Sequence, residues 1–74
     1  MPSSEYLRVD RVMRVAKRLR ERQPFNAETL AEEFGATSRT IKRDIDLLRQ
    51  RGWVIEWVHD EHTYDLKRAP RAIL

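Results

Sequence analysis

The fold of this chain is decided by the stretch Asn26-Ala-Glu-Thr-Leu-Ala-Glu-Glu-Phe-Gly-Ala-Thr-Ser-Arg-Thr-Ile-Lys-Arg-Asp-Ile-Asp-Leu-Leu48. The side-chain oxygen of Asn26 can accept a hydrogen bond from an amide of a first helical turn that has no other partner. Apolar residues recur behind it at helical spacing, namely Leu30, Ala31 and Phe34. Gly35 follows directly and supplies the left-handed conformation that ends many helices. The sequence therefore predicts a short helix that begins after Asn26 and stops at Gly35.

A further helix follows this glycine after a very short link. Thr37 can cap it, and its apolar side chains recur at helical spacing: Ile41, Ile45 and Leu48. So short a link makes the two helix axes cross steeply, as in a helix-turn-helix, and the small side chain of Ala31 leaves room for a close crossing. Two capped amphipathic helices around a glycine also form ordinary helical hairpins, so the charges on the helix after Thr37 have to distinguish the two interpretations.

These charges are concentrated on one part of that helix. Its basic and hydroxyl side chains lie on the first two turns and off the apolar stripe: Ser38, Arg39, Thr40, Lys42 and Arg43. A recognition helix presents this end to base edges and phosphates of the major groove. We therefore expect these residues, with Thr37, to face double-stranded DNA, and Arg49 and Arg51 to hold phosphates. Asp44 lies beside the apolar stripe, which favours a structural ion pair or hydrogen bond over recognition of cytosine.

The composition excludes several classes of protein. A chain of 74 residues forms one domain at most and has a marginal hydrophobic core. Without cysteine it has no disulfide and no thiolate metal site. No segment approaches the length of a membrane span, so we expect a cytoplasmic protein, associated with the nucleoid, that has no membrane partner.

The net charge of +3 says less than its distribution along the chain. Seven basic residues lie between Arg8 and Arg22 against two acidic ones, whereas residues 27–34 contain three glutamates and no basic residue. A uniformly solvated surface would mix the two signs. The segregation therefore favours a polyanion on one side of the molecule, with the glutamate-bearing helix mostly turned away.

The first helix is expected from about Glu5 to about Arg22, with Ser4 as its cap and Pro24 as the residue that ends it. Its apolar stripe should join the core: Val9, Val12, Met13, Ala16 and Leu19, with Val15 at the margin. The basic residues opposite this stripe form a solvated face or, as the alternative, contact the DNA backbone or an anionic partner.

Beyond Gly52, which ends the helix after Thr37, the pattern changes to strands. Residues 53–58 are β-branched and aromatic, and their alternation places Trp53, Ile55 and Trp57 together. A turn at residues 59–62 leads to a second strand at residues 63–67, where Tyr64 and Leu66 share a face. Such a hairpin must pack its apolar side against the helices, and Phe25 is a candidate for a short third strand beside it.

Three helices and a hairpin give a mainly α fold with a small β-hairpin, a winged helix-turn-helix. We assign residues 1–67 to this domain and residues 68–74 to a tail or linker, because Pro70 breaks regular structure and two terminal apolar residues have no obvious burial. The tail would lead to an effector domain or dock on a protein partner.

The same residues resemble the N-terminal winged-helix domain of DeoR-type and WYL-domain bacterial transcription regulators, and they are also similar to the DNA-binding domain of the biotin ligase repressor. The resemblance covers nearly everything from Arg11 to Leu66 and is most specific at Arg39-Thr-Ile-Lys-Arg-Asp44. The positions that carry it are Leu30, Ala31, Phe34, Ala36, Arg39, Thr40, Ile41, Arg43, Asp44, Ile45, Leu48, Gly52, Tyr64 and Leu66. It implies a recognition helix in the major groove, with Thr37 in the place of the family's usual serine cap.

The chain departs from that family at the turn of the hairpin, where the wing is usually rich in glycine. Here the turn is His59-Asp-Glu-His62, and its carboxylates would repel phosphate, so insertion of the wing into the minor groove is not expected. Histidine and carboxylate also serve in metal sites and in acid–base catalysis. Neighbouring residues on a tight turn point apart, however, and no further histidine or cysteine completes a site. We expect no metal, no cofactor and no enzyme activity.

The predicted function is sequence-specific binding of double-stranded DNA by a prokaryotic or phage transcription regulator such as a repressor. A single small domain makes few base contacts, so we expect a homodimer on an inverted repeat. Two alternatives are a protein-interaction module that uses Trp53 and Trp57 of the hairpin, and nonspecific binding of nucleic acid by the basic surface.

Overall fold

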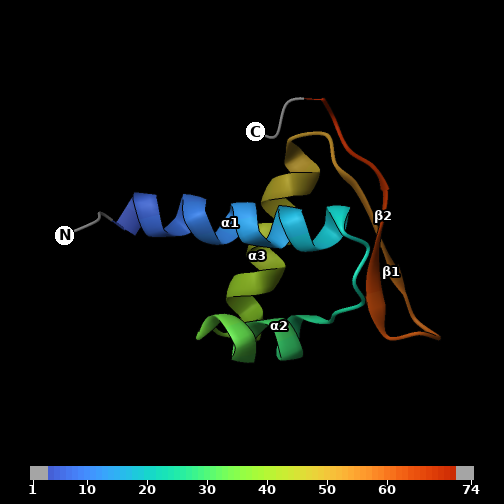
Figure 1. Ribbon diagram of the computed structural model, residues 1–74, viewed down its shortest axis with the longest axis horizontal. Helices are drawn as coiled ribbons and strands as arrows, with labels where there is room; N and C mark the ends of the chain where they lie inside the picture. Colours follow the sequence, from blue (N-terminus) through green and yellow to red (C-terminus); the bar gives the residue numbers. More distant parts are fainter. Residues whose placement is uncertain (1–3, 72–74) are drawn as a thin grey trace.

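The computed structural model describes the backbone of residues 4–71 and the side chains of residues 7–71. Its elements follow one another as α1 (Ser4–Arg20), α2 (Ala27–Phe34), α3 (Ser38–Gln50), β1 (Val54–Val58) and β2 (Thr63–Arg68). The two strands pair as an antiparallel hairpin beside the helices (Figure 1). This mainly helical arrangement confirms the winged helix-turn-helix that the sequence predicts.

Helix α2 has the predicted caps at both ends. Asn26 Oδ1 accepts a hydrogen bond from the Thr29 amide at 2.9 Å, and the Thr29 hydroxyl accepts one from the Asn26 amide at 3.3 Å. At the other end Gly35 has a φ of 67°, and the Ala36 amide donates to the Ala31 carbonyl at 2.9 Å. The left-handed glycine reverses the chain directly after the helix, as predicted.

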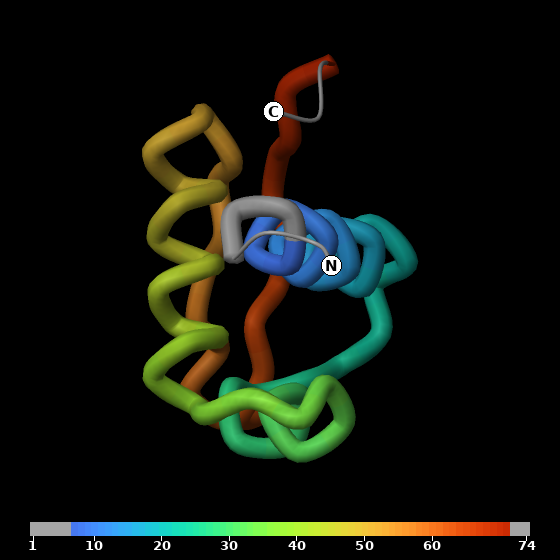
Figure 2. Tube along the Cα trace, turned by 90° about the vertical axis from the view of Figure 1, so that its left-hand side faces the viewer, coloured from blue at the N-terminus to red at the C-terminus, as the bar shows by residue number. Residues whose placement is uncertain are grey.

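Helix α1 lies across α3, and its N-terminal part extends beyond α3 (Figure 1). Figure 2, which looks along α1, shows α3 on one side of it and α2 below. The side chains that α1 buries are Val12, Val15, Ala16 and Leu19. They join Leu30, Ala31, Ile41, Ile45 and Leu48 of the other two helices in a single core.

The predicted apolar stripe of α1 was partly wrong. Val15, expected at the margin, is fully buried, whereas Val9 and Met13 are 49% and 42% exposed. An ion pair between Arg11 of α1 and Asp44 of α3 accounts for the difference, because it turns the Arg11 side of the helix toward α3 and carries Val15 inward. Val9 and Met13 lie on the opposite flank and are left at the surface.

Both ends of α1 also differ from the prediction. The helix ends at Arg20, and a turn follows in which Arg22 adopts a positive φ of 55°. Its first described residue, Ser4, already belongs to the helix, and the capping side chain that we expected there lies outside the described side chains.

The hairpin has the predicted alternation. Ile55 pairs with Leu66 in the register and both are buried, while Trp57 pairs with Tyr64 and their rings meet edge to face at 4.8 Å. Trp53, just before β1, is buried as well. These side chains cover the core, and a β-bulge between Val54 and Ile55 marks the start of the paired region.

The third strand suggested at Phe25 does not form within the described residues, where the sheet has two strands. Phe25 is nonetheless buried beside β2, and its carbonyl accepts a hydrogen bond from the Tyr64 amide at 3.0 Å. This is the backbone–backbone bond that Phe25 makes with β2, because the Phe25 amide donates to the Thr63 side chain and Pro24 has no amide hydrogen to continue a ladder. Strand β2 runs to Arg68, one residue beyond the prediction, and Ala69 packs against the core.

Candidate nucleic-acid interface

Helix α3 divides into a buried side and an exposed side. Its buried side chains are Ile41, Asp44, Ile45 and Leu48, which recur every three or four residues. Arg39, Lys42 and Arg43 are exposed on the other side, as the spacing predicts. The helix therefore uses one side to hold the fold and presents three cations to solvent on the other.

These three cations differ from many other basic residues in having no partner within residues 7–71, whose side chains the structure describes. In the described part of the chain, Arg39, Lys42 and Arg43 make no hydrogen bond or ion pair. Elsewhere the protein neutralises its own charges through the pairs Arg11–Asp44, Arg14–Asp10, Arg18–Glu33, Arg22–Asp65, Arg49–Asp46 and Lys67–Asp65. The guanidinium of Arg20 lies 5.1 Å from the centre of the Trp53 ring. The exposed side of α3 is thus a surface where positive charge is left for an external anion.

The hydroxyl residues at the start of α3 have a structural role as well. Thr37 Oγ1 accepts the Thr40 amide hydrogen at 3.2 Å and so caps the helix, as predicted. The Thr37 hydroxyl also donates to Thr40 Oγ1 at 3.0 Å. The hydrogen of the Thr40 hydroxyl is therefore still available to donate to a ligand, and Ser38 stands half-buried between the two.

The two arginines near the end of α3 lie in different settings. Arg49 donates to the Ile55 carbonyl from Nη2 at 2.9 Å and from Nε at 3.3 Å, and Nη1 lies 3.4 Å from Asp46. Arg49 therefore ties α3 to β1. Arg51 is exposed at the C-cap, where Gly52 follows with a φ of 98°. That either of them holds a phosphate stays a prediction.

Asp44 is the buried polar group of this helix, at 1% exposure. Its two oxygens accept hydrogen bonds from Arg11, from Nε at 2.5 Å and from Nη2 at 2.9 Å. The bond raises the pKa of Arg11 above its ordinary value, because the charged guanidinium is the form that the carboxylate stabilises. The structural ion pair is therefore the correct interpretation of Asp44, and cytosine recognition is not. Arg11 was not predicted as its partner, since the two residues are far apart in sequence.

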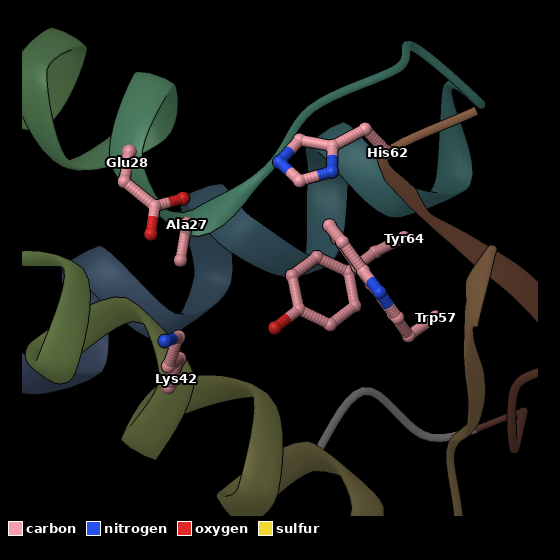
Figure 3. Close-up of a pocket in the computed structure, with 6 residues that line it drawn as sticks. All are labelled: Ala27, Glu28, Lys42, Trp57, His62 and Tyr64. Atoms are coloured by element: carbon pink, nitrogen blue, oxygen red, sulfur yellow. The ribbon is translucent and has the colours of Figure 1, made fainter. Parts of the chain in front are cut away.

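A hollow of about 360 Å³ lies on the hairpin side of α3 (Figure 3). Its wall is made by Ala27, Glu28, Lys42, Trp57, His62 and Tyr64. Trp57 meets His62 edge to face at 5.0 Å, and the Tyr64 hydroxyl points toward the space between Glu28 and Lys42 (Figure 3). Burial raises the pKa of Tyr64 above its ordinary value of 10.0. With one carboxylate and one ammonium group at its mouth, this hollow has no net preference for an anion.

The turn of the hairpin is exposed and does not assemble a site. His59, Asp60, Glu61 and His62 all lie at the surface, and His62 adopts a positive φ of 55°. Among the residues that the structure describes, no group of histidine and carboxylate side chains could hold a metal ion. Within the same residues, no helix has the length and apolar character needed to cross a membrane.

Three helices, a C-terminal hairpin and an exposed basic third helix define the class of helix-turn-helix domains. Residues 11–59 match a family model described as an HTH domain, and the chain belongs to this family. It is accordingly a DNA-binding domain of the type found in transcription regulators. Comparison with curated proteins and with solved structures gave no match.

Proposed function

We propose that the protein binds double-stranded DNA sequence-specifically, with α3 in the major groove. One observation carries this proposal: α3 exposes Arg39, Lys42 and Arg43 without partners among the described residues, while its opposite side is buried in the core. Arginine at such positions can bond two acceptors of a guanine edge, and lysine can bond a base acceptor or a phosphate. Ser38 and Thr40 supply short hydroxyl donors in the same two turns.

The remaining predicted contacts complete this proposal. Thr37 lies at the N-terminus of α3, where a phosphate would meet unpaired amides of the first turn. Arg51 is exposed at the far end, and Arg49 would contact a phosphate only with donor hydrogens that Ile55 and Asp46 leave unused. The residues proposed to contact base edges, the reading set, therefore lie in the N-terminal half of α3.

The resemblance to DeoR-type and WYL-domain regulators supports a bacterial or phage transcription regulator, for instance a repressor in the cytoplasm. Because one domain offers few base contacts, the proposal includes a homodimer that binds an inverted repeat. The predicted DNA-binding domain of residues 1–67 would extend to Ala69, because β2 runs to Arg68 and Ala69 packs against the core, and the rest of the predicted tail would connect it to an effector domain or a partner.

The wing would lie outside the minor groove. Asp60 and Glu61 are exposed at its tip, and neither makes an ion pair within the described residues. Two uncompensated carboxylates at the tip would meet the phosphates that border the groove, and at short range this repulsion is weakly screened. DNA contacts would therefore come from the helices.

The test is selection from a pool of random DNA duplexes at physiological salt, followed by sequencing of the retained fraction. A double variant, Arg39→Ala with Arg43→Ala, removes two of the proposed contacts. Its matched control, Arg14→Ala with Lys17→Ala, removes the same charge from the exposed side of α1. An enriched motif that the first variant loses and the control keeps is the expected result, and the spacing of its half-sites reports the dimer.

Other results would contradict the proposal in distinct ways. Retention without any motif would show nonspecific binding of nucleic acid. No retention of DNA would favour the protein-interaction alternative, for which Trp57 is the available hairpin tryptophan because Trp53 is buried at 2% exposure. In that case, binding of a protein partner should survive loss of Lys42 and Arg43 and fail on truncation of Trp57.

A further inference from the structure

A second, smaller hollow lies between α1 and the first two turns of α3. Its volume is about 180 Å³, and it is lined by Arg8, Arg11, Thr40, Arg43 and Asp44. Two of these residues come from α1 and three from the first two turns of α3. The hollow therefore lies between the proposed recognition helix and the N-terminal half of α1.

The lining of this hollow is strongly positive. It holds three guanidinium groups against one carboxylate, and that carboxylate is already used: Asp44 is bound side-on by Nε and Nη2 of Arg11. Arg8 and Arg43 are exposed and have no hydrogen bond or ion pair with any residue that the structure describes. Two uncompensated positive charges thus face the same small space.

Hydrogen-bond donors of the hollow that have no partner among the described residues also point to an anion. Because Arg11 uses Nε and Nη2 for Asp44, its Nη1 has no partner among the described residues. Thr40 adds a hydroxyl whose oxygen already accepts from Thr37, which leaves its hydrogen free to donate. The site therefore has several N–H and O–H donors, and the carboxylate in its lining, Asp44, is already bound by Arg11.

We propose that this hollow binds one phosphate of the DNA backbone between Arg8 of α1 and Arg43 of α3. The guanidinium of Arg43 has five N–H donors, so it can contact this phosphate as well as a base edge. The inference rests on the proposed function, since it extends the same DNA-facing surface from α3 onto α1. A phosphodiester is the anion that a helix in the major groove brings to this place, because phosphates border the groove on both sides. Arg8 positions the domain on the backbone and reads no base.

Asp44 and Arg11 have a positioning role in this site. The bidentate pair fixes the Arg11 guanidinium at the back of the hollow, so that it neither fills the space nor turns to solvent. It also fixes the angle between α1 and α3, which sets the distance between Arg8 and Arg43. The buried pair thereby links the stability of the fold to the geometry of the phosphate site.

The first experiment measures the salt dependence of binding to the selected operator for the wild-type protein and for Arg8→Ala. Loss of one phosphate contact should reduce the slope of log K against log salt by about 0.9 and leave the preferred sequence unchanged. Lys17→Ala is the control, because Lys17 is an exposed cation of the same helix outside the hollow and, like Arg8, makes no ion pair with the described residues. Arg8→Lys should keep most of the slope, since a phosphate contact requires the charge. An Arg8→Ala slope equal to that of the wild type would overturn the inference.

A second experiment locates the phosphate. Each backbone phosphate of the operator is replaced in turn by an uncharged methylphosphonate, and the affinities of the wild-type protein and Arg8→Ala are compared. Neutralising the phosphate at one position should weaken the wild type severalfold and weaken Arg8→Ala clearly less, because Arg43 still contacts that phosphate in the variant. If every position weakens both proteins equally, Arg8 contacts no phosphate, although the domain still binds DNA. If the wild-type protein selects no operator at all, the proposed function itself fails, and this inference fails with it.

Discussion

Thr63 and Phe25 are bonded to each other in both directions across 38 positions of the chain. Thr63 Oγ1 accepts a hydrogen bond from the Phe25 amide at 2.8 Å and donates to the Phe25 carbonyl at 3.0 Å. Thr63 is buried, so water does not replace these bonds easily. This side chain does for the loop before α2 what a third strand would otherwise do, and it holds the start of the helix-turn-helix against the hairpin.

Thr63→Val should destabilise the protein, because the buried amide of Phe25 loses its acceptor while the size of the side chain hardly changes. The expected loss is about 1–3 kcal/mol in the free energy of unfolding. Urea denaturation followed by circular dichroism measures it. Thr63→Ser keeps the hydroxyl and serves as the control. Equal stability of the valine variant and the wild type would show that the hydrogen bonds contribute nothing net.

Asp44→Asn should weaken the packing of α1 on α3. The amide cannot accept both guanidinium donors as a carboxylate does, and hydrogen bonds to charged groups contribute about 1.5–3 kcal/mol each. Arg11 has 26% of its side chain exposed, so water can solvate part of the charge left behind. The control is Asp46→Asn, whose carboxylate is exposed on the same helix and should change stability by less than about 0.5 kcal/mol. Chemical denaturation measures the free energy of unfolding of both variants. Equal losses in Asp44→Asn and Asp46→Asn would contradict the prediction.

Gly35→Ala should cost about 1 kcal/mol of stability. A Cβ at this position meets no atom within 4 Å, so sterics with the rest of the protein do not contribute. The cost comes from the φ of 67°, which alanine adopts unfavourably, and is partly offset by the lower entropy of the unfolded chain. Gly35→Asn should be milder, because asparagine tolerates the left-handed region better. Thermal unfolding should give the highest melting temperature for the wild type, a lower one for Gly35→Asn and the lowest for Gly35→Ala. A Gly35→Ala variant more stable than Gly35→Asn would refute the prediction.

Single substitutions on α3 should affect DNA binding and leave stability unchanged. Arg39→Ala and Arg43→Ala are each expected to weaken specific binding by about 1–3 kcal/mol and to relax the sequence preference at one position. Since neither side chain has a partner in the described structure, the melting temperature should stay within error of the wild type. Fluorescence anisotropy with operator and mismatched duplexes measures the effect. Unchanged operator affinity would remove that residue from the reading set.

The stability of the fold should decline at high pH through Tyr64. Burial raises the pKa of its phenol in the folded state above the ordinary value of 10.0. A group with a raised folded pKa stabilises the protein fully below its unfolded pKa, and this contribution is lost as the pH rises through the folded pKa. Tyr64→Phe should therefore reduce the fall in stability above pH 10. In a Tyr6→Phe background Tyr64 is the sole tyrosine, so its phenolate absorbance gives the folded pKa directly; a midpoint at or below 10 would contradict the prediction.

The helix-turn-helix could be predicted from the sequence because its signals are local. Asn26 caps through Thr29, only three residues away, and Thr37 caps through Thr40 in the same way. Gly35 needs no distant contact to adopt its left-handed conformation. The exposure of Arg39 on α3 likewise follows from helical periodicity, since Ile41 and Ile45 determine which side is buried.

What the sequence did not reveal depends on contacts between distant residues. The rotation of α1, which buries Val15 and exposes Met13, follows from the pairing of Arg11 with Asp44, 33 positions away. Helical periodicity alone does not decide which of Met13 and Val15 is buried, and it does not reveal that Asp44 pairs with Arg11. The hollow around Arg8 could not be inferred for the same reason, because it exists only where α1 crosses α3. Its one signal in the sequence is that Arg8 and Arg11 are three residues apart, on the side of the helix that continues into Val12 and Val15.

On α3, the residues proposed to bind DNA differ from the residues that hold the fold together, whereas many binding sites use the same residues for both. Arg39, Lys42 and Arg43 hold no other described element in place, whereas Asp44, one position further, anchors α1. Under the proposed function, substitutions at positions 39, 42 and 43 can therefore alter the preferred DNA sequence without endangering folding, provided that Asp44 is kept. A domain organised in this way can diverge in target choice by single steps, and a library randomised at these three positions should yield mostly folded variants from which new specificities can be selected.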